Sequence, residues 1–427
     1  MENEFSQEKI TTNLRDPFHA KAFLAFLIIT SLILPTTNAF GIPIKHLAFI
    51  SFLFVLLSKW MAGFKINKNI IILIIASCIF CIFFLLLGAL STFVHFRYSL
   101  SESLQFLTTV AVGLSIIIAK SMHVAEDEEI ISYTFYGIFF YTIWKSVAGL
   151  LVSLGIVNYY HFLNFLGNAF GYIPVGGAVY GNLYRINIIA PDFIATFFLL
   201  FIPCFPSAFS KIPILFQRIF IISGILCLVF SFSRLLFVMA ALSWVYIFFF
   251  KFSFKQRFIL VSLLVCVVAV ASYWVQDVFI WTKEAFEERF VSSRSVHNKI
   301  NDDVREDQTE ALMNEWGKTP YLGGGFGYFA KNYIRSSDTP YTYEVQWVSF
   351  LMKFGIFGIS FLIFLLLLIF YGILKGKRSS GHYVLVFTLL AYIVGSFTNQ
   401  YAFSSVSSIF YIIHLNFASV LRKNMQY

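Results

Sequence analysis

The sequence predicts an all-α, polytopic membrane protein of about twelve transmembrane helices with one long extracytoplasmic loop that contains short helices. Of the 427 residues, 59% are hydrophobic and only 12% are charged, and the mean hydropathy is +0.78, which excludes a soluble domain with one buried core. Apolar runs of about 17 to 25 residues recur along the chain, and each can cross a roughly 30 Å hydrocarbon layer as a helix. The basic residues gather in alternate loops, as the positive-inside rule requires.

The predicted spans divide the chain into three parts. Residues 1–275 hold nine spans, residues 276–344 form the long extracytoplasmic (periplasmic) loop, and residues 345–427 hold three more spans. A second long outer segment is predicted at 156–185. The spans are expected near 22–38, 44–60, 69–90, 103–119, 131–155, 186–205, 215–232, 234–250, 257–275, 345–373, 382–399 and 403–420.

The loop charges predict the orientation. An even number of spans places both termini in the cytoplasm, together with most of the Lys and Arg residues that flank spans. The opposite short loops carry only Lys45, Arg97, Arg185 and Arg234. The net charge of +9 is therefore explained by topology and by anionic lipid head groups, and we expect no nucleic-acid partner. The first apolar run follows a polar stretch and is expected to stay as an anchor.

The long outer loop contains two patterned segments. Val304, Gln308, Ala311, Leu312 and Glu315-Trp316 recur at helical spacing and predict a helix over about 303–317. A glycine-rich run follows at 320–329, but it lacks the Gly-Lys-Ser/Thr ending of a phosphate loop and lies on the outer side, away from ATP. Its glycines are expected to let the loop fold closely over the membrane surface.

Ionisable residues within the predicted spans are a further clue, because each costs at least about 2 to 3 kcal/mol at the bilayer centre. Lys145, Arg185, Asp192, Arg234 and Lys353 all lie toward the outer leaflet. The lysines can instead snorkel to head groups and the arginines can anchor at the interface, so both interpretations stay open. A continuous helix would place Arg185 and Asp192 on one face, although Pro191 can kink it. Together the cations would suit a diphosphate, which accepts bidentate hydrogen bonds from arginine.

Several short motifs occur in a fixed order along the outer side. They are Tyr184-Arg185-Ile186-Asn187-Ile188-Ile189-Ala190-Pro191-Asp192-Phe193-Ile194-Ala195, Ser233-Arg234, Arg305-Glu306-Asp307-Gln308-x-x-Ala311, Pro320-x-x-Gly323-x-Gly325-x-Gly327-x-Phe329 and Gly355-x-x-Gly358. In this order they resemble the motifs of the bacterial O-antigen ligase and O-antigen polymerase family. One departure is informative. Ligases of the family carry a His-Asn pair eleven residues before the Gly-x-x-Gly, where this chain has Glu344-Val345, and this difference favours a polymerase.

The resemblance implies glycosyl transfer in the bacterial inner membrane, from an undecaprenyl-diphosphate-linked oligosaccharide to a sugar hydroxyl of another lipid-linked repeat unit. Arg185 and Arg305 are expected to stabilise the leaving diphosphate, with Arg234 in support. Glu344 is expected to act as the base, although it can instead stabilise the start of the tenth span, and Tyr341 or Tyr343 can replace it. The other expected substrate-binding residues are Asp192, Lys145, Lys353, Gly325 and Gly327.

The sequence predicts no cofactor and no metal, because no His or Asp-x-Asp cluster lies outside. The expected partners are the lipid-linked oligosaccharide and the bilayer, with a chain-length regulator as a further candidate. Two other functions stay open. One is an O-antigen ligase that transfers glycan to the lipid A core, and the other is a flippase or transporter of lipid-linked oligosaccharide.

Overall fold

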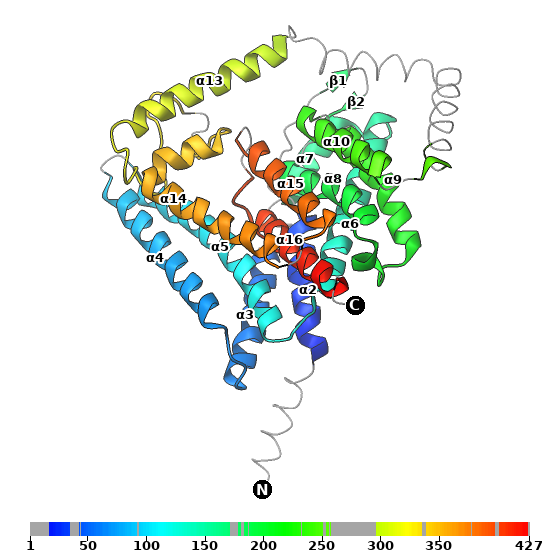
Figure 1. The fold of residues 1–427 in the computed structure, drawn as a ribbon. Coiled ribbons are helices and arrows are strands. Elements are labelled where there is room, and N and C mark those ends of the chain that lie inside the picture. Colours follow the sequence, from blue (N-terminus) through cyan, green and yellow to red (C-terminus); the bar gives the residue numbers. More distant parts are fainter. Residues whose placement is uncertain are drawn as a thin grey trace. The chain divides into compact units, whose positions relative to one another are not determined.

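The computed structural model describes residues 17–34, 42, 44–91, 94–170, 178–180, 183–186, 188–231, 233–250, 253–255, 257, 296–334, 339–376, 378–397 and 401–425. Most of them are helical (Figure 1). The chain forms two compact units. The first unit comprises the described residues within Met1–Ile33, Ile42–Gly137 and Val304–Tyr427. The second unit comprises those within Leu34–Gly41 and Ile138–Asp303, and helix α6 contributes to both.

The first unit is built around α5 and α16. Helix α5 packs against α3, α4 and α16, and α16 also packs against α2, α14 and α15. Both central helices bury hydroxyl groups that form hydrogen bonds: Thr109 on α5 donates to the Gln105 carbonyl, and Ser407 on α16 bonds to the Tyr392 hydroxyl. The helices are α2 (Pro17–Ile33), α3 (Ile44–Met61), α4 (Lys68–Leu90), α5 (Phe96–Ser121), the start of α6 (Asp127–Ser153), α13 (Val296–Trp316) from Val304 onward, α14 (Gln346–Leu374), α15 (Ser380–Gly395) and α16 (Ser405–Asn424).

The second unit is built around α8 (Ile189–Cys204), which packs against α9 (Ile214–Ser231) and α10 (Arg234–Phe250). Its aromatic side chains Phe193, Phe197 and Phe201 recur every fourth residue and are fully or almost fully buried. The rest of α6, α7 (Tyr159–Phe170), the antiparallel strands β1 (Ala178–Tyr180) and β2 (Leu183–Tyr184), and the 3-10 helix η1 (Pro206–Phe209) complete the unit.

The structure confirms the all-α, polytopic class. Within the described residues, six helices are long and apolar enough to cross a membrane: α3, α4, α5, α6, α9 and α14. Shorter apolar helices lie at His19–Ile33, Ala190–Cys204, Arg234–Phe249 and Ser380–Gly395. On α4, exposed Ile72, Ile75 and Ile79 form the kind of apolar surface that faces lipid. The predicted span 257–275 lies outside the described residues apart from Arg257, so the total of twelve stays a prediction.

The glycine-rich run hydrogen-bonds to the backbone of α14 where that helix is interrupted. Gly355 interrupts α14 with φ 58° and ψ −168°, and residues 319–329, the glycine loop, bond to the exposed backbone on both sides of the break. Gly325 N–H donates to Lys353 C=O at 2.7 Å, and Ile356 N–H donates to Pro320 C=O at 3.0 Å. A Cβ atom on Gly355 would lie 2.3 Å from the Tyr321 carbonyl oxygen. Only glycine combines this positive φ with so close an approach.

Candidate active site

Two of the predicted catalytic groups, Arg305 and Glu344, lie together in the first unit. Arg305 Nε donates to Glu344 Oε2 at 3.1 Å. One turn later on α13, Gln308 Oε1 accepts a hydrogen bond from Glu344 N–H at 3.0 Å. A single turn of α13 therefore fixes both the side chain and the backbone of Glu344, just before α14 begins.

Helix α13 holds these groups in place through one buried face. Gln308 and Leu312 are fully buried and Glu315 is 7% exposed, while Glu306 and Asp307 face outward. This pattern confirms the helix predicted for 303–317, although the helix begins earlier, at Val296. Residues 296–302 are polar apart from Val296 and Ile300, which is why apolar spacing alone did not reveal the earlier start.

The Arg305 and Glu344 side chains are 32% and 29% exposed, so a substrate can reach both. Glu344 lies directly before the N-cap of α14, Val345, and outside the first turn of that helix. Its carboxylate contacts Arg305, and its two predicted roles, base and helix-stabilising acid, both stay predictions. An arginine fork beside an accessible carboxylate can bind an anionic group and then release the carboxylate.

The neighbouring tyrosines are poorly suited to act as the base. Burial raises the pKa of Tyr341 and of Tyr343 above the ordinary value, so both phenols stay protonated at neutral pH. Tyr343 Oη also accepts a hydrogen bond from Ala330 N–H at 2.8 Å, and Tyr341 is 3% exposed. Glu344 is therefore the best placed of the three candidates.

Lys353 does not snorkel to the interface, because its ammonium group is directed into the protein. It pairs with Glu102 Oε1 at 2.5 Å and donates to Tyr341 C=O at 2.6 Å, and its side chain is 2% exposed. The other carboxylate oxygen of Glu102 accepts Gly327 N–H at 2.6 Å. This ion pair thus ties α5, the glycine loop and α14 together.

Gly325 and Gly327, which were predicted to bind substrate, lie where the glycine loop crosses α4 and α5. A Cβ atom on Gly325 would lie 2.1 Å from Gly88 N, and one on Gly327 would lie 2.5 Å from Ser99 N. Both positions are therefore needed for close packing between backbones. A cavity of about 130 Å³ lies beside this crossing, and Glu102 and Lys353 are among its lining residues.

Glu102 is a site residue that the sequence reasoning missed. The predicted span began at 103, but α5 begins at Phe96, because its polar first turns face the glycine loop rather than lipid. The available signal was an acidic residue between Ser101 and Ser103, directly before an apolar run. An acid in that position has to find a partner when the helix packs.

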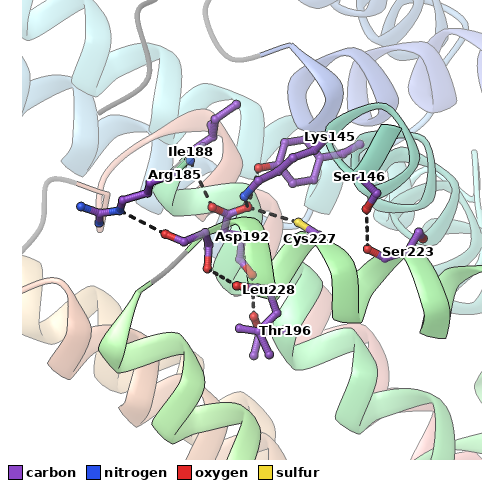
Figure 2. Close-up of polar contacts among 11 residues, drawn as sticks. Lys145, Ser146, Arg185, Ile188, Asp192, Thr196, Ser223, Cys227 and Leu228 are labelled. Atoms are coloured by element: carbon purple, nitrogen blue, oxygen red, sulfur yellow. Dashed lines mark hydrogen bonds and ion pairs between the residues drawn. The ribbon is translucent and has the colours of Figure 1, made fainter. Parts of the chain in front are cut away.

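In the second unit, Lys145 and Asp192 form a buried ion pair at the start of α8 (Figure 2). Lys145 Nζ lies 2.5 Å from Asp192 Oδ1, and the two side chains are 0% and 1% exposed. Tyr141 Oη donates to the same oxygen at 2.6 Å, and Ile188 N–H donates to Oδ2 at 3.1 Å. The carboxylate therefore accepts a backbone N–H at the helix N-terminus and neutralises the lysine.

Arg185 precedes α8, which begins at Ile189, so the continuous helix considered for Arg185 and Asp192 does not form. Instead, Ile186 N–H donates to Phe230 C=O at 2.9 Å, and Arg185 Nε donates to Ser231 C=O at 3.1 Å (Figure 2). The end of α9 thus holds the segment that carries Arg185. Arg234 is exposed at the first position of α10, where the sequence predicted that a helix opens.

The structure thus brings predicted residues together in two pairings, Arg305 with Glu344 and Lys145 with Asp192, and it pairs the predicted Lys353 with Glu102, which was not predicted. Arg185 belongs to the second unit and Arg305 to the first. Among the described residues, no group of three or more His, Cys, Asp or Glu side chains is placed to hold a metal ion.

The comparison with protein families identifies the region that contains this site. Residues 219–363 match the family model described as O-antigen ligase. These residues, about a third of the chain, are similar to that family. The matched region extends from α9 into α14 and includes Arg234, Arg305, the glycine loop, Glu344 and Lys353. A search of curated proteins gives no match. The family match confirms the resemblance and supports a ligase or polymerase type of function.

Proposed function

We propose that this chain is a surface-polysaccharide (O-antigen) polymerase at the outer face of the bacterial inner membrane. It transfers the glycan of one undecaprenyl-diphosphate-linked unit to a sugar hydroxyl of another lipid-linked repeat unit. The observation that carries the proposal is the accessible Arg305 and Glu344 pair at 3.1 Å within the matched family region. Ligases of the family have a His-Asn pair where this chain has Glu344-Val345, which favours the polymerase.

The pairing suggests an order of events. The donor diphosphate has two or more negative oxygens that match the arginine fork better than one carboxylate does, so donor binding draws the Arg305 guanidinium away from Glu344. The released carboxylate then accepts the proton of the acceptor hydroxyl. The acceptor oxygen bonds to the anomeric carbon, the bond from that carbon to the diphosphate oxygen breaks, and the lipid diphosphate leaves as an anion stabilised by Arg305.

Arg185 and Arg234 are proposed as further cations for the diphosphate. Both lie in the second unit, and the proposal for them rests on their charge and on the family motifs. Arg185 is held at its Nε by Ser231 C=O. Lys145, Asp192 and Lys353 are proposed to act on the substrate through the backbone segments that they hold, because each is engaged in a buried pair.

A ligase is the second candidate, because the matching family model is described as O-antigen ligase. The two functions leave different products when the gene is deleted. A polymerase deletion yields a lipid A core capped with one repeat unit, whereas a ligase deletion yields bare lipid A core with full-length glycan retained on its carrier. Electrophoresis of the surface glycan distinguishes them, and bare core would overturn the polymerase proposal.

The catalytic residues are tested in the same deletion strain. Arg305→Ala should abolish polymer at normal protein level, while Arg305→Lys should restore it only in part, because lysine cannot form the bidentate pair. Arg185→Ala should also abolish polymer. Lys318→Ala is a matched control, because Lys318 is 63% exposed and pairs only across one helix turn with Glu315. Full polymer from both alanine variants at positions 185 and 305 would refute the assignment.

A further inference from the structure

The first unit contains a cavity of about 130 Å³, and most of the residues that line it have no role in the proposed reaction. Its wall includes Glu102, Gln105 and Phe106 from α5, spaced three and four residues apart on one helix face. Facing residues from α14 are Gln346, Ser349 and Lys353, again three and four residues apart. Residues 341–343, which directly precede Glu344, complete the polar side of the wall.

Several polar groups in this wall have no partner among the described residues. Ser349 is 3% exposed, and no described residue forms a hydrogen bond with its hydroxyl. Gln346 is 8% exposed, and only its Oε1 is used, by Ala402 N–H at 2.8 Å, so its Nε2 is left with two donors. Buried hydroxyl and amide groups are normally satisfied. The Ser349 hydroxyl and the Gln346 amide belong instead to residues that line the cavity, where a ligand with its own donors and acceptors can hydrogen-bond to them.

The charge and the apolar part of the wall restrict the class of ligand. Lys353 is neutralised by Glu102 at 2.5 Å, so the cavity offers no net positive charge to a phosphate. Phe106, Phe326 and Phe403 line the rest, and the Phe106 ring centroid lies 5.7 Å and 5.5 Å from the other two. A wall with aromatic rings on one part and amide, hydroxyl and carboxylate groups on another matches a sugar, which has apolar C–H faces and polar hydroxyl edges.

We propose that this cavity binds one sugar ring of the acceptor glycan. The inference rests on the proposed function and adds a glycan subsite to it. Tyr343 and Gln346 belong to the cavity wall and flank Glu344 in the chain, so the site lies along the segment that carries the proposed base. The Ser349 hydroxyl and the Gln346 amide hydrogen-bond to sugar hydroxyls, and the ring faces rest on the phenylalanines.

The test uses the full-length chain in lipid nanodiscs and lipid-linked repeat units extracted from cells that lack the gene. Ser349→Ala removes one hydrogen bond and should raise KM about fivefold with kcat within about twofold, because the lost contact is the same in ground and transition states. Ser349→Leu fills the cavity and should raise KM by about twentyfold or more. Ser360→Ala and Ser360→Leu are the controls, because Ser360 lies on the same helix, is exposed, and bonds only to Ile356 C=O.

A binding measurement separates this inference from the proposed function. Oligosaccharide released from the extracted lipid by mild acid is observed by saturation-transfer NMR with the nanodisc-embedded chain. Signal from the wild type and Ser360→Leu, but not from Ser349→Leu, supports the subsite even if no elongation is seen, in which case only the proposed function fails. Elongation with unchanged KM and unchanged transfer signal for Ser349→Leu overturns the subsite and leaves the polymerase standing. Gel filtration shows whether each variant is folded. If Ser349→Leu is misfolded, the KM of Ser349→Ala is the test: a rise of about fivefold supports the subsite, and an unchanged KM overturns it.

Discussion

The Lys145 and Asp192 pair allows a quantitative test of how the second unit is held together. Lys145→Met removes the ammonium but keeps the length of the side chain, and Asp192→Asn removes the carboxylate charge but keeps an oxygen acceptor. Both wild-type side chains are at most 1% exposed and 2.5 Å apart. Each single variant therefore leaves one buried charge without its counter-charge, which typically destabilises a protein by about 3 to 5 kcal/mol.

The double variant should recover most of that loss. It carries no buried charge, and the amide oxygen introduced by Asp192→Asn can still accept from one of the two donors that contact Asp192, Tyr141 Oη at 2.6 Å on Oδ1 or Ile188 N–H at 3.1 Å on Oδ2. Replacement of both members of a buried ion pair is often neutral, but the second donor loses its acceptor at a cost of about 1 to 3 kcal/mol. The stability of the double variant should therefore lie within about 3 kcal/mol of wild type, well above that expected from the sum of the two single losses. Lys21→Met is the control, because Lys21 and Glu129 form a pair that is 35% and 23% exposed, and such pairs contribute only about 0 to 1 kcal/mol.

The assay is reversible unfolding in mixed detergent micelles titrated with sodium dodecyl sulfate and followed by tryptophan fluorescence. A coupling free energy of about 3 kcal/mol or more between the two sites is expected from the four variants. Single variants as stable as the Lys21→Met control, or a double variant that shows the full sum of the two losses, would refute the reasoning. Polymer yield measured in parallel should follow stability, because both residues act through the segment that carries Arg185.

Three further outcomes are expected. Glu344→Gln should reduce the rate of glycan transfer about a hundredfold or more, whereas Glu344→Asp should retain some activity. Glu310→Gln, at an exposed position on α13, is the control and should transfer glycan at a near-normal rate. Near wild-type turnover of Glu344→Gln in the nanodisc assay would remove this residue from the mechanism. Cysteine placed at exposed Asn332 should react with an impermeant thiol reagent on outer-membrane-permeabilised cells, and labelling only after inner-membrane lysis would reverse the orientation. Burial and the nearby Glu315 charge raise the pKa of Tyr328 from 10.0 to about 12. The stability that the protonated phenol contributes is therefore complete below pH 10 and is lost as the pH rises toward 12. Tyr328→Phe should reduce this loss of stability at alkaline pH in a pH series of unfolding titrations, and an equally steep loss in the variant would contradict the assignment.

Hydropathy was enough to predict the long apolar helices, because lipid-exposed helices must be apolar over their full length, but it did not indicate α7, which lies within the predicted outer segment 156–185. The helix predicted at 234–250 is α10, with the same bounds. The start of α5 was predicted seven residues late, at 103 rather than 96, since its first turns are polar where they meet the glycine loop. Hydropathy identifies helical segments that are buried in lipid, but it does not identify helical turns that pack against a polar loop of the same chain.

The candidate site was predicted less completely, because pairing depends on tertiary contacts. Motif order indicated Arg305, Glu344 and the glycine loop, and the helical spacing of 303–317 was confirmed. The partner of Lys353 is 251 residues away in the chain, and no local pattern connects it to Glu102. For the same reason, the sequence left open whether Lys145 snorkels or pairs, and only the packing of α6 beside α8 identifies Asp192 as its partner.

The insertion of the glycine loop into the break of α14 also constrains how the protein is assembled. The loop contacts α4 and α5, which are synthesised early, through Phe326 N–H to Phe84 C=O at 3.0 Å and Gly327 N–H to Glu102. In the same loop, the Tyr321 C=O accepts a hydrogen bond from Phe357 N–H of α14 at 3.2 Å. These bonds cannot all form until residue 357 has left the ribosome and entered the membrane. The glycine loop must therefore wait for α14, which is synthesised later, before it can close the fold, and a chain terminated before that helix would contain every residue of the loop without the helix that holds it.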